Sequence, residues 1–386
     1  MRESVMNNTE ENIGIDIHQK EYDLYLQEGV DVVIFLATLC VLGTIGNLHV
    51  LVVYQKQYKI SNFKLFIIVL ALNDLLTCIL SIPFEIVRTR YKFTFQVDVF
   101  CKISRFFVYI FSNTCGLILS FIAVERCRKI CAPFRRQLSH RMVTIAVVCL
   151  FVFSALLSVP TLLYCKILDK PLPDHGNYTG SHCACEKNLL YTVHQGIILG
   201  ISTIALIVVL VSYILTARVV FKTRNFDVFS QDDGGTSVKL VKMNSLTSSD
   251  NGGKENKKDK NNSKPVEKTL SKKSLLHRSS SKARSQYLNR AIRNTIILMV
   301  ATIISYIGIL PVFIIGILQA VDSGIYEVVE DQLGSAKSIL TRLYFLSGVM
   351  HPFVYLVMDR TFRGACRDIY VNCIRNISCR KRTSPS

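Results

Sequence analysis

Seven long apolar segments constrain the fold of this chain more than any other feature of its 386 residues. A helix needs roughly 20 mainly apolar residues to cross the hydrocarbon core of a bilayer, which is about 30 Å thick. A soluble protein can bury one or two such helices, but no soluble packing hides seven of them between short polar loops. We therefore expect an all-α membrane protein built as a seven-transmembrane helix bundle. The segments lie at about 31–54, 63–87, 103–125, 142–164, 190–221, 291–318 and 338–358.

The net charge of +18 is unevenly distributed, and this orients the bundle. Lysine and arginine accumulate in cytoplasmic loops. Here the loops after the first, third and fifth segments are basic, whereas residues 1–30 are acidic. The loop between the second and third segments opposes the pattern with Arg88, Arg90 and Lys92, but the other loops agree. The sequence predicts a multi-pass plasma-membrane protein with its N-terminus outside the cell.

This topology divides the chain into five parts. A polar, lysine- and serine-rich stretch between the fifth and sixth helices is too poor in apolar residues to fold alone. The expected parts are an extracellular tail at 1–30, helices one to five at 31–221, a disordered cytoplasmic loop at 222–289, helices six and seven at 290–358, and a cytoplasmic tail that begins with a short amphipathic helix at 359–386.

Four of the 13 cysteines fall near the predicted outer face, where the compartment is oxidising. A bond from Cys101, at the start of the third helix, to the following outer loop would fix that loop across the mouth of the bundle. Four cysteines permit three pairings, and the sequence does not choose among them. As the partner of Cys101 we take Cys185 or, as the alternative, Cys183. The fourth member of the group is Cys165.

Two kinds of covalent modification follow from the topology. Asn7 and Asn177 lie in Asn-X-Ser/Thr motifs on the outer side, so we expect glycans on both. Cys366, Cys373 and Cys379 follow the last apolar segment among basic and apolar residues. Reversible palmitoylation and free reduced thiols are both open alternatives for these three.

Polar residues inside the spans mark functional positions, because each costs about 2.5–3.5 kcal/mol on insertion scales. The deepest are Asn47, Asp74, the adjacent pair Glu125 and Arg126, and His351. Prolines kink helices, and kinked helices around a polar core form a bundle with two available packings. Such prolines stand at positions 83, 160, 311 and 352.

The order of these motifs along the chain carries a resemblance. The first segment contains GN, the second LAxxD, the third opens with a cysteine and closes with an acid–arginine pair, the sixth has a central proline and the seventh xPxxY. In this order they resemble the rhodopsin-like (class A) G protein-coupled receptors, of the peptide-receptor type. The match covers every span. The residues that carry it are Asn47, Asp74, Cys101, Arg126, Tyr213, Pro311, Pro352 and Tyr355.

The resemblance implies a switch at the inner face. Glu125 pairs with Arg126 at rest, and on activation the arginine is released towards Tyr213 and a heterotrimeric G protein. Pro352 and Tyr355 belong to the same switch. Receptor kinases, arrestin and membrane lipids are the other expected partners, with no nucleic acid and no cofactor. No nucleophile–base set or metal-ligand cluster is visible, so we expect no enzyme.

The polar core departs from the family pattern. In relatives an Asp, a Ser and an Asn help to hold a sodium ion that favours the inactive state. Here Asp74 and Ser347 are suitable ligands, but Cys115 replaces the serine and His351 replaces the asparagine. Asn47 is the remaining member of the predicted polar core. Two alternatives remain open. A protonated His351 replaces the ion, or a neutral His351 only hydrogen-bonds Asp74.

The predicted ligand is an extracellular neuropeptide. Val108 stands where amine receptors of the family carry an aspartate, which argues against a monoamine. The mouth offers Glu85, Arg105, Tyr109 and Gln319, and a mouth with both signs of charge suits a peptide. A non-peptide small molecule or a lipid is the alternative ligand. A transporter is a third reading, although no internal repeat is visible to support it.

Overall fold

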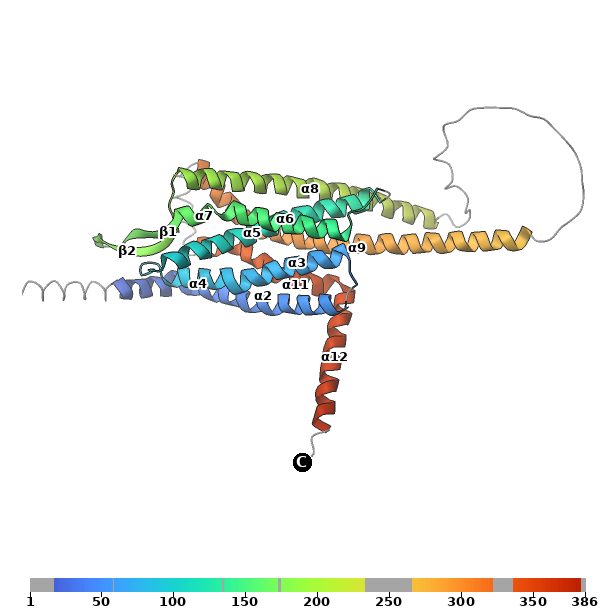
Figure 1. Cartoon of the computed structure of the whole chain (residues 1–386), viewed down its shortest axis with the longest axis horizontal. Helices are drawn as coiled ribbons and strands as arrows, with labels where there is room; N and C mark the ends of the chain where they lie inside the picture. The colour runs from blue at the N-terminus through green and yellow to red at the C-terminus, as the bar shows by residue number, and fades with distance from the viewer. Residues whose placement is uncertain are drawn as a thin grey trace, which may run out of the picture.

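A computed structural model shows the chain as a bundle of long helices with a β-hairpin at one end (Figure 1). It describes residues 17–57, 59–133, 135–172, 175–232, 266–321 and 336–382. Within these ranges seven helices are long and apolar enough to cross a membrane, which confirms the predicted fold class. They are Val30–Lys56, Asn62–Arg90, Asp98–Cys131, His140–Tyr164, Leu189–Lys222, Asn289–Ile315 and Ala336–Met358.

The spans are built from the following elements. The first is α2 (Val30–Gln57), the second combines α3 (Asn62–Leu76), η2 (Thr77–Ser81) and α4 (Ile82–Arg90), and the third is α5 (Asp98–Cys131). The fourth combines α6 (His140–Ser158) and α7 (Thr161–Tyr164), and the fifth lies in α8 (Leu189–Asp232). The sixth lies in α9 (Val266–Val321), and the seventh ends with η3 (Leu343–Phe345) and α11 (Leu346–Met358).

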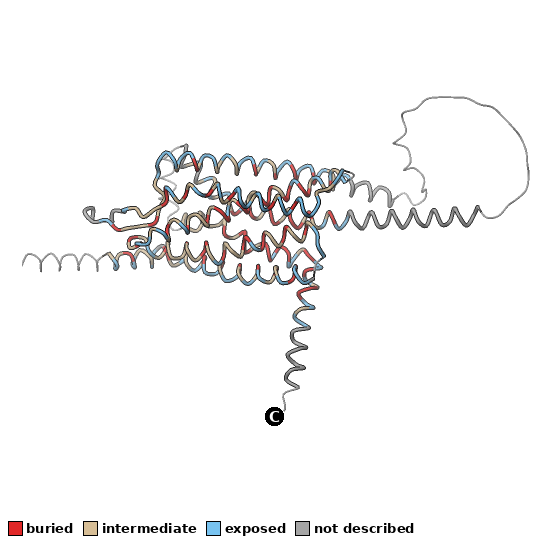
Figure 2. The backbone as a smooth tube through the Cα atoms, viewed as in Figure 1, coloured by how far each residue is buried: buried red, intermediate tan, exposed pale blue. Residues whose placement is uncertain are grey.

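The outward surface of the bundle is apolar and its interior holds polar groups. Buried positions line the inner faces of the helices (Figure 2). Ile45, Leu163 and Ile207 are 61%, 69% and 54% exposed, whereas Asn47 and His351 are fully buried. A soluble monomer does not expose so many large apolar side chains, but the tails of a bilayer solvate them.

Prolines act on the helices in different ways. Pro83 has no N–H to donate, and the second span takes a π-helical turn, η2, directly before it. In the fourth span α6 ends at Ser158, and Pro160 becomes the N-cap of the short α7. Pro311 and Pro352 lie inside α9 and α11. Pro83 and Pro160 therefore lie at boundaries between the helices of a span, whereas Pro311 and Pro352 lie inside continuous helices.

The hairpin consists of β1 (Cys165–Leu172) and β2 (His175–Cys185), paired antiparallel with Cys165 opposite Cys185. One disulfide joins Cys101 in α5 to Cys183, and a second joins Cys165 to Cys185. Cys185, the partner of Cys101 that we took first from the sequence, is therefore wrong, and the alternative Cys183 is right. The sequence could not choose because only one residue separates the two cysteines in the loop.

The predicted boundaries of the soluble parts need adjustment. The chain is already helical before the first span, with η1 at Tyr25–Gly29. The Glu21 carboxylate accepts hydrogen bonds from the backbone N–H groups of Phe93 and Thr94 at 2.7 and 3.1 Å, so this segment packs on the loop after α4. The fifth and sixth helices also continue into the predicted loop 222–289, to Asp232 and from Val266. Residues 233–265 lie outside the described ranges.

A helix after the last span is confirmed. α12 (Arg360–Arg382) leaves the bundle sideways (Figure 1), anchored by the Tyr54 hydroxyl, which donates to Asp359 at 2.9 Å. Cys366 is buried in the main core cluster, and burial raises the pKa of its thiol. This conformation does not present Cys366 for acylation. The side chains of Cys373 and Cys379 lie outside those described, so palmitoylation there stays a prediction, as does glycosylation of Asn7 and Asn177.

The disulfide pairing predicts a reciprocal labelling pattern. In Cys185→Ser, iodoacetamide applied in denaturant without reductant should alkylate Cys165 and leave Cys101 protected, because only the hairpin bond is lost. In Cys183→Ser the pattern should reverse. Peptide mass spectrometry of receptor purified from cells measures both. Alkylation of Cys101 in Cys185→Ser would contradict the pairing.

Candidate functional site

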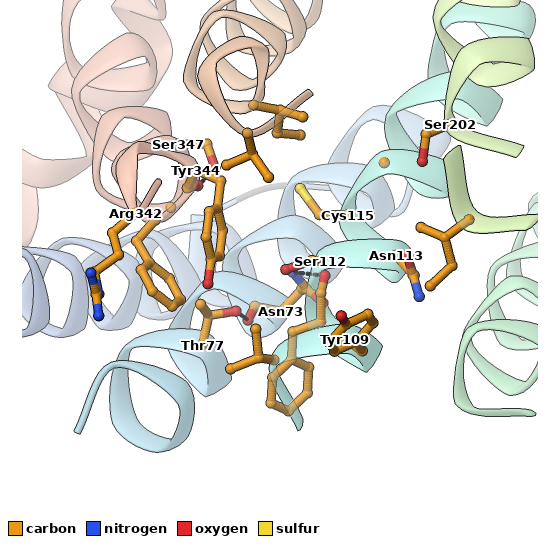
Figure 3. Close-up of a pocket in the computed structure, with 18 of the residues that line it drawn as sticks. Asn73, Thr77, Tyr109, Ser112, Asn113, Cys115, Ser202, Arg342, Tyr344 and Ser347 are labelled. Carbon is orange, nitrogen blue, oxygen red and sulfur yellow. Dashed lines mark hydrogen bonds between the residues drawn. The ribbon is translucent and has the colours of Figure 1, made fainter. Parts of the chain in front are cut away.

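A cavity of about 410 Å³ opens into the hairpin end of the bundle. Helices of the second to seventh spans contribute to its wall. Part of this wall is apolar, with Val108 and Phe111 from α5 and Phe313 from α9. Tyr109 and Tyr344 enter the cavity from the third and seventh spans (Figure 3). Its size, and a wall that combines apolar and aromatic side chains with polar groups, are typical of a small-molecule or peptide side-chain site.

Charged side chains gather where this cavity meets the hairpin end. The Glu85 carboxylate, 3% exposed, lies 2.8 Å from an Arg105 nitrogen and 2.6 Å from one of Arg88. Arg342, just before η3, approaches it at 3.3 Å. The predicted mouth residues Glu85, Arg105 and Tyr109 do line one cavity. The Gln319 side chain lies outside those described.

Sequence reasoning missed Arg342. It lies 257 residues from Glu85 along the chain, and no motif marks it. The signal that could have found it is its position: a cation in the first turns of a predicted apolar helix is costly without a partner. That partner is Glu85, a buried carboxylate that itself needs a positive charge nearby.

Tyr109 belongs to a hydrogen-bonded group between the third, fourth and fifth spans. Its hydroxyl accepts from the Gln195 amide at 2.7 Å, and the same amide nitrogen lies 3.3 Å from the Tyr164 hydroxyl. The Tyr164 hydroxyl is also 2.8 Å from His194 Nδ1. These contacts fix the ring of Tyr109 at the edge of the cavity.

The polar core around Asp74 lies at the deep end of the cavity. His351 Nδ1 is 2.7 Å from Asp74 Oδ2, and His351 Nε2 is 2.8 Å from the Ser305 hydroxyl. All three side chains are buried. One imidazole ring thus connects the second, sixth and seventh spans. The sequence predicted the contact with Asp74 but not the contact with Ser305.

The Ser305 hydroxyl couples this ring to the sixth helix. Its oxygen is 3.0 Å from the Ala301 carbonyl as well as 2.8 Å from His351 Nε2. A hydroxyl has one proton to donate. With a neutral ring that donates from Nδ1 to Asp74, Ser305 gives its proton to Nε2. With a protonated ring, Nε2 donates to Ser305, which then gives its own proton to Ala301.

The other predicted core residues surround the same carboxylate. Asn47 donates from its amide to the Gly348 carbonyl at 2.7 Å, and a Cβ on Gly348 would lie 3.3 Å from that of Asp74. Cys115 and Ser347 line the deep end of the cavity with Asp74 (Figure 3). The structure therefore brings the predicted polar core together, with the imidazole of His351 on Asp74.

The opposite end of the bundle is closed over a buried ion pair. Arg126 Nε lies 2.7 Å from Glu125 Oε2, and Arg126 has no exposed surface. Glu125 Oε1 also accepts from the Asn62 amide at 3.2 Å, and that amide donates to the Leu138 carbonyl at 3.1 Å. The guanidinium lies over the ring of Phe66, 5.4 Å from its centroid. Arg126 is thus held on its own acidic neighbour.

In the described part of the chain, neither tyrosine predicted for the switch forms a hydrogen bond with Arg126. The Tyr213 hydroxyl is 2.9 Å from that of Thr302 in α9. Tyr355 is fully buried, and its hydroxyl has no hydrogen-bond partner among the described residues. The Tyr355 hydroxyl is therefore free to donate to a group that approaches it. Pro352 lies one helical turn before it.

Seven spans around a polar core, with a cavity at one end and a closed ion pair at the other, define a multi-pass membrane receptor. A family model described as the 7 transmembrane receptor (rhodopsin family) matches residues 46–355. The chain belongs to this family of plasma-membrane receptors. The resemblance drawn from the sequence motifs is confirmed.

Two groups of curated relatives are similar to the chain. It is 23% identical over 359 residues to the cholecystokinin receptor of Xenopus laevis, covering 89% of this chain and 76% of the relative. It is 25% identical over 358 residues to the cholecystokinin receptor type A of Cavia porcellus, covering 89% and 80%. The neuropeptide Y receptor type 1 of Xenopus laevis is 25% identical over 186 residues, covering 47% of this chain and 50% of that receptor.

The contact between His351 and Asp74 predicts unequal effects of two substitutions. His351→Ala leaves a buried carboxylate without its partner and should destabilise the bundle by about 3–5 kcal/mol. His351→Asn keeps an N–H that can donate to Asp74, so its loss should be smaller. Thermal unfolding of the purified receptor measures both. Equal midpoints for the two variants would contradict a direct contact.

The same pair predicts a response to sodium. Since the imidazole occupies the carboxylate, basal nucleotide exchange in the wild type should not change between sodium-free buffer and about 0.15 M sodium, with choline as the replacement. His351→Asn should become sodium-inhibited. Strong sodium inhibition of the wild type would contradict replacement of the ion by His351.

Proposed function

We propose that this chain is a neuropeptide receptor that activates a heterotrimeric G protein. The observation that carries the proposal is the match to the rhodopsin family over residues 46–355 together with the buried Glu125–Arg126 pair. The relatives named as cholecystokinin and neuropeptide Y receptors support a peptide as the ligand class. The charged rim of the cavity also supports it.

In this proposal the hairpin end faces the outside of the cell. Both disulfides lie there, and disulfides persist in oxidising compartments. Basic residues Arg128, Lys129, Arg135 and Arg136 lie at the opposite end, in agreement with the rule that positive loops stay inside. A peptide would then enter between the hairpin and the seventh span, and the G protein would bind at the α12 end.

In this proposal the described conformation corresponds to the resting state. Arg126 is buried on Glu125, so it offers no group to a partner. Activation separates the inner ends of the third and sixth spans, releases Arg126 from Glu125, and gives the unpaired Tyr355 hydroxyl a partner. States of this kind need to differ by only a few kcal/mol. Receptor kinases and arrestin would bind the same inner face after activation.

A receptor for a non-peptide small molecule or a lipid is the second candidate. The apolar part of the cavity wall favours it, because Val108, Phe111 and Phe313 could hold an apolar ligand without a peptide backbone. A screen of neuropeptides and of lipids on cells that express the chain separates the two. Guanine-nucleotide-sensitive responses to lipids alone would overturn the peptide assignment.

Arg126→Ala tests the transducing role. It should abolish nucleotide exchange on the G protein while surface expression stays near that of the wild type, because the arginine is proposed to contact the partner only after release. Exchange of labelled GTP in membranes measures the effect. Asn62→Ala is the matched comparison: it loosens Glu125 without removing Arg126 and should raise basal exchange. Undiminished exchange in well-expressed Arg126→Ala would contradict the assignment.

Ala291 offers a second test of the resting state. It is buried at the inner end of the sixth span, whereas its neighbours Arg290 and Arg293 are exposed, so the buried face of this helix turn carries no acid to hold Arg126. We expect measurable basal exchange in the wild type. Ala291→Glu should lower it by supplying an ion-pair partner, and the neutral Ala291→Gln should not. Equal basal exchange in the two variants would refute the argument.

A further inference from the structure

The cluster at the mouth of the cavity has more positive than negative charge. Glu85 is the one acidic side chain within ion-pair distance of Arg88, Arg105 and Arg342 among the described residues. The exposed fractions of the Arg88, Arg105 and Arg342 side chains are 31%, 15% and 12%, and that of the Glu85 side chain is 3%. Two positive charges therefore remain uncompensated by this carboxylate in a partly desolvated site, where such an excess is costly.

We propose that this arginine cluster binds a carboxylate of the ligand, so that the peptide presents an anionic group at the mouth and an apolar or aromatic side chain to the cavity below. The inference rests on the proposed peptide receptor and names the chemistry of its ligand. The cluster residues are Arg88, Arg105 and Arg342, with Glu85 as the acid that holds them in place.

The donors that remain in the cluster suit a carboxylate. A guanidinium has five N–H groups in a planar fork, and Glu85 has only two oxygens to receive three such forks. Arg88 directs Nε and one terminal nitrogen to a single Glu85 oxygen, at 3.3 and 2.6 Å. The remaining N–H groups of the three arginines can donate to a second carboxylate.

Arg105 is the cluster member with most donors left for a ligand. Arg342 is bound to the Ser338 carbonyl at 2.7 Å and approaches the Thr89 hydroxyl at 3.4 Å, so it also holds the seventh span against the second. The contact of Arg105 with Glu85, at 2.8 Å, is its one ion pair among described residues. Arg105 also lines the cavity, one helical turn before Val108 and Tyr109.

The wall below the cluster determines the rest of the ligand. Tyr109 and Tyr344 line the cavity from the third and seventh spans (Figure 3), and Phe111 and Phe313 lie among its lining residues. Aromatic rings pack well on such a wall. A carboxylate next to an aromatic side chain therefore matches the cavity better than either group alone.

Three small probes test the proposal on the full-length receptor in detergent or nanodiscs. N-acetyl-phenylalanine carries a free carboxylate, N-acetyl-phenylalaninamide is its neutral match, and N-acetyl-aspartyl-phenylalaninamide carries the acid on a side chain. Binding is measured as stabilisation against thermal unfolding, at concentrations on the order of millimolar as expected for fragments of this size. At least one acidic probe should bind about tenfold or more tightly than the neutral amide, as expected for a charge-assisted contact.

Variants assign that preference to the cluster. Arg105→Gln should remove most of the preference, and Arg105→Lys should keep part of it because the charge remains. Lys102→Gln is the matched control, since Lys102 lies in the same helix but pairs with Asp98 and does not line the cavity. If Arg105→Gln does not fold, Arg88→Gln takes its place. Equal binding of acids and amide, or an unchanged preference in the folded arginine variant, overturns the proposal.

The three probes also separate two sources of the carboxylate. Tighter binding of N-acetyl-phenylalanine assigns the cluster to a free peptide C-terminus, and tighter binding of the aspartyl probe assigns it to an acidic side chain. Basal nucleotide exchange in the same preparation tests the proposed function separately. Exchange without any preference for acids overturns the carboxylate site alone, whereas a preference without exchange supports the site and contradicts coupling to the G protein.

Discussion

The contact between His351 and Asp74 is the interaction on which the rest of the bundle depends. It lies at the deep end of the ligand-sized cavity, on the side of the inner ion pair, and through Ser305 it connects three spans at once. A buried carboxylate is costly without a hydrogen-bond partner, so this contact helps to set where the second and seventh helices meet. Gly348 permits the approach, because a side chain there would crowd Asp74.

The polar groups at the two ends of the bundle follow different rules. At the α12 end one buried acid is matched by one buried base: Glu125 holds Arg126, and Asn62 orients Glu125. At the hairpin end one acid serves three arginines. A balanced pair in a dry site stabilises one conformation, whereas an excess of one sign attracts a ligand of the other. The balanced end therefore suits the switch and the unbalanced end suits recognition.

Much of the fold could be predicted from the sequence, because span length and the order of motifs are local properties. Span length predicted the seven spans, and the order of motifs predicted the switch residues Glu125 and Arg126. The contacts of His351 with Ser305 and of Glu85 with Arg342 could not be predicted, since each joins residues far apart in the chain whose side chains face each other only after packing. The predicted partner of Cys101 was wrong for a related reason: Cys183 and Cys185 lie two residues apart in the same strand, β2.

The π-helical turn at Thr77–Ser81 has a consequence for the whole mouth. Such a turn holds one more residue than an α-helical turn, and each residue of an α-helix advances the side-chain direction by about 100°. Every side chain of α4 therefore points about a quarter of a turn away from its place in an uninterrupted helix. Without this rotation the carboxylate of Glu85 would point about a quarter of a turn away from Arg105 and Arg342. The one residue that the π-helical turn adds ahead of Pro83 thus sets the direction in which α4 presents its acid.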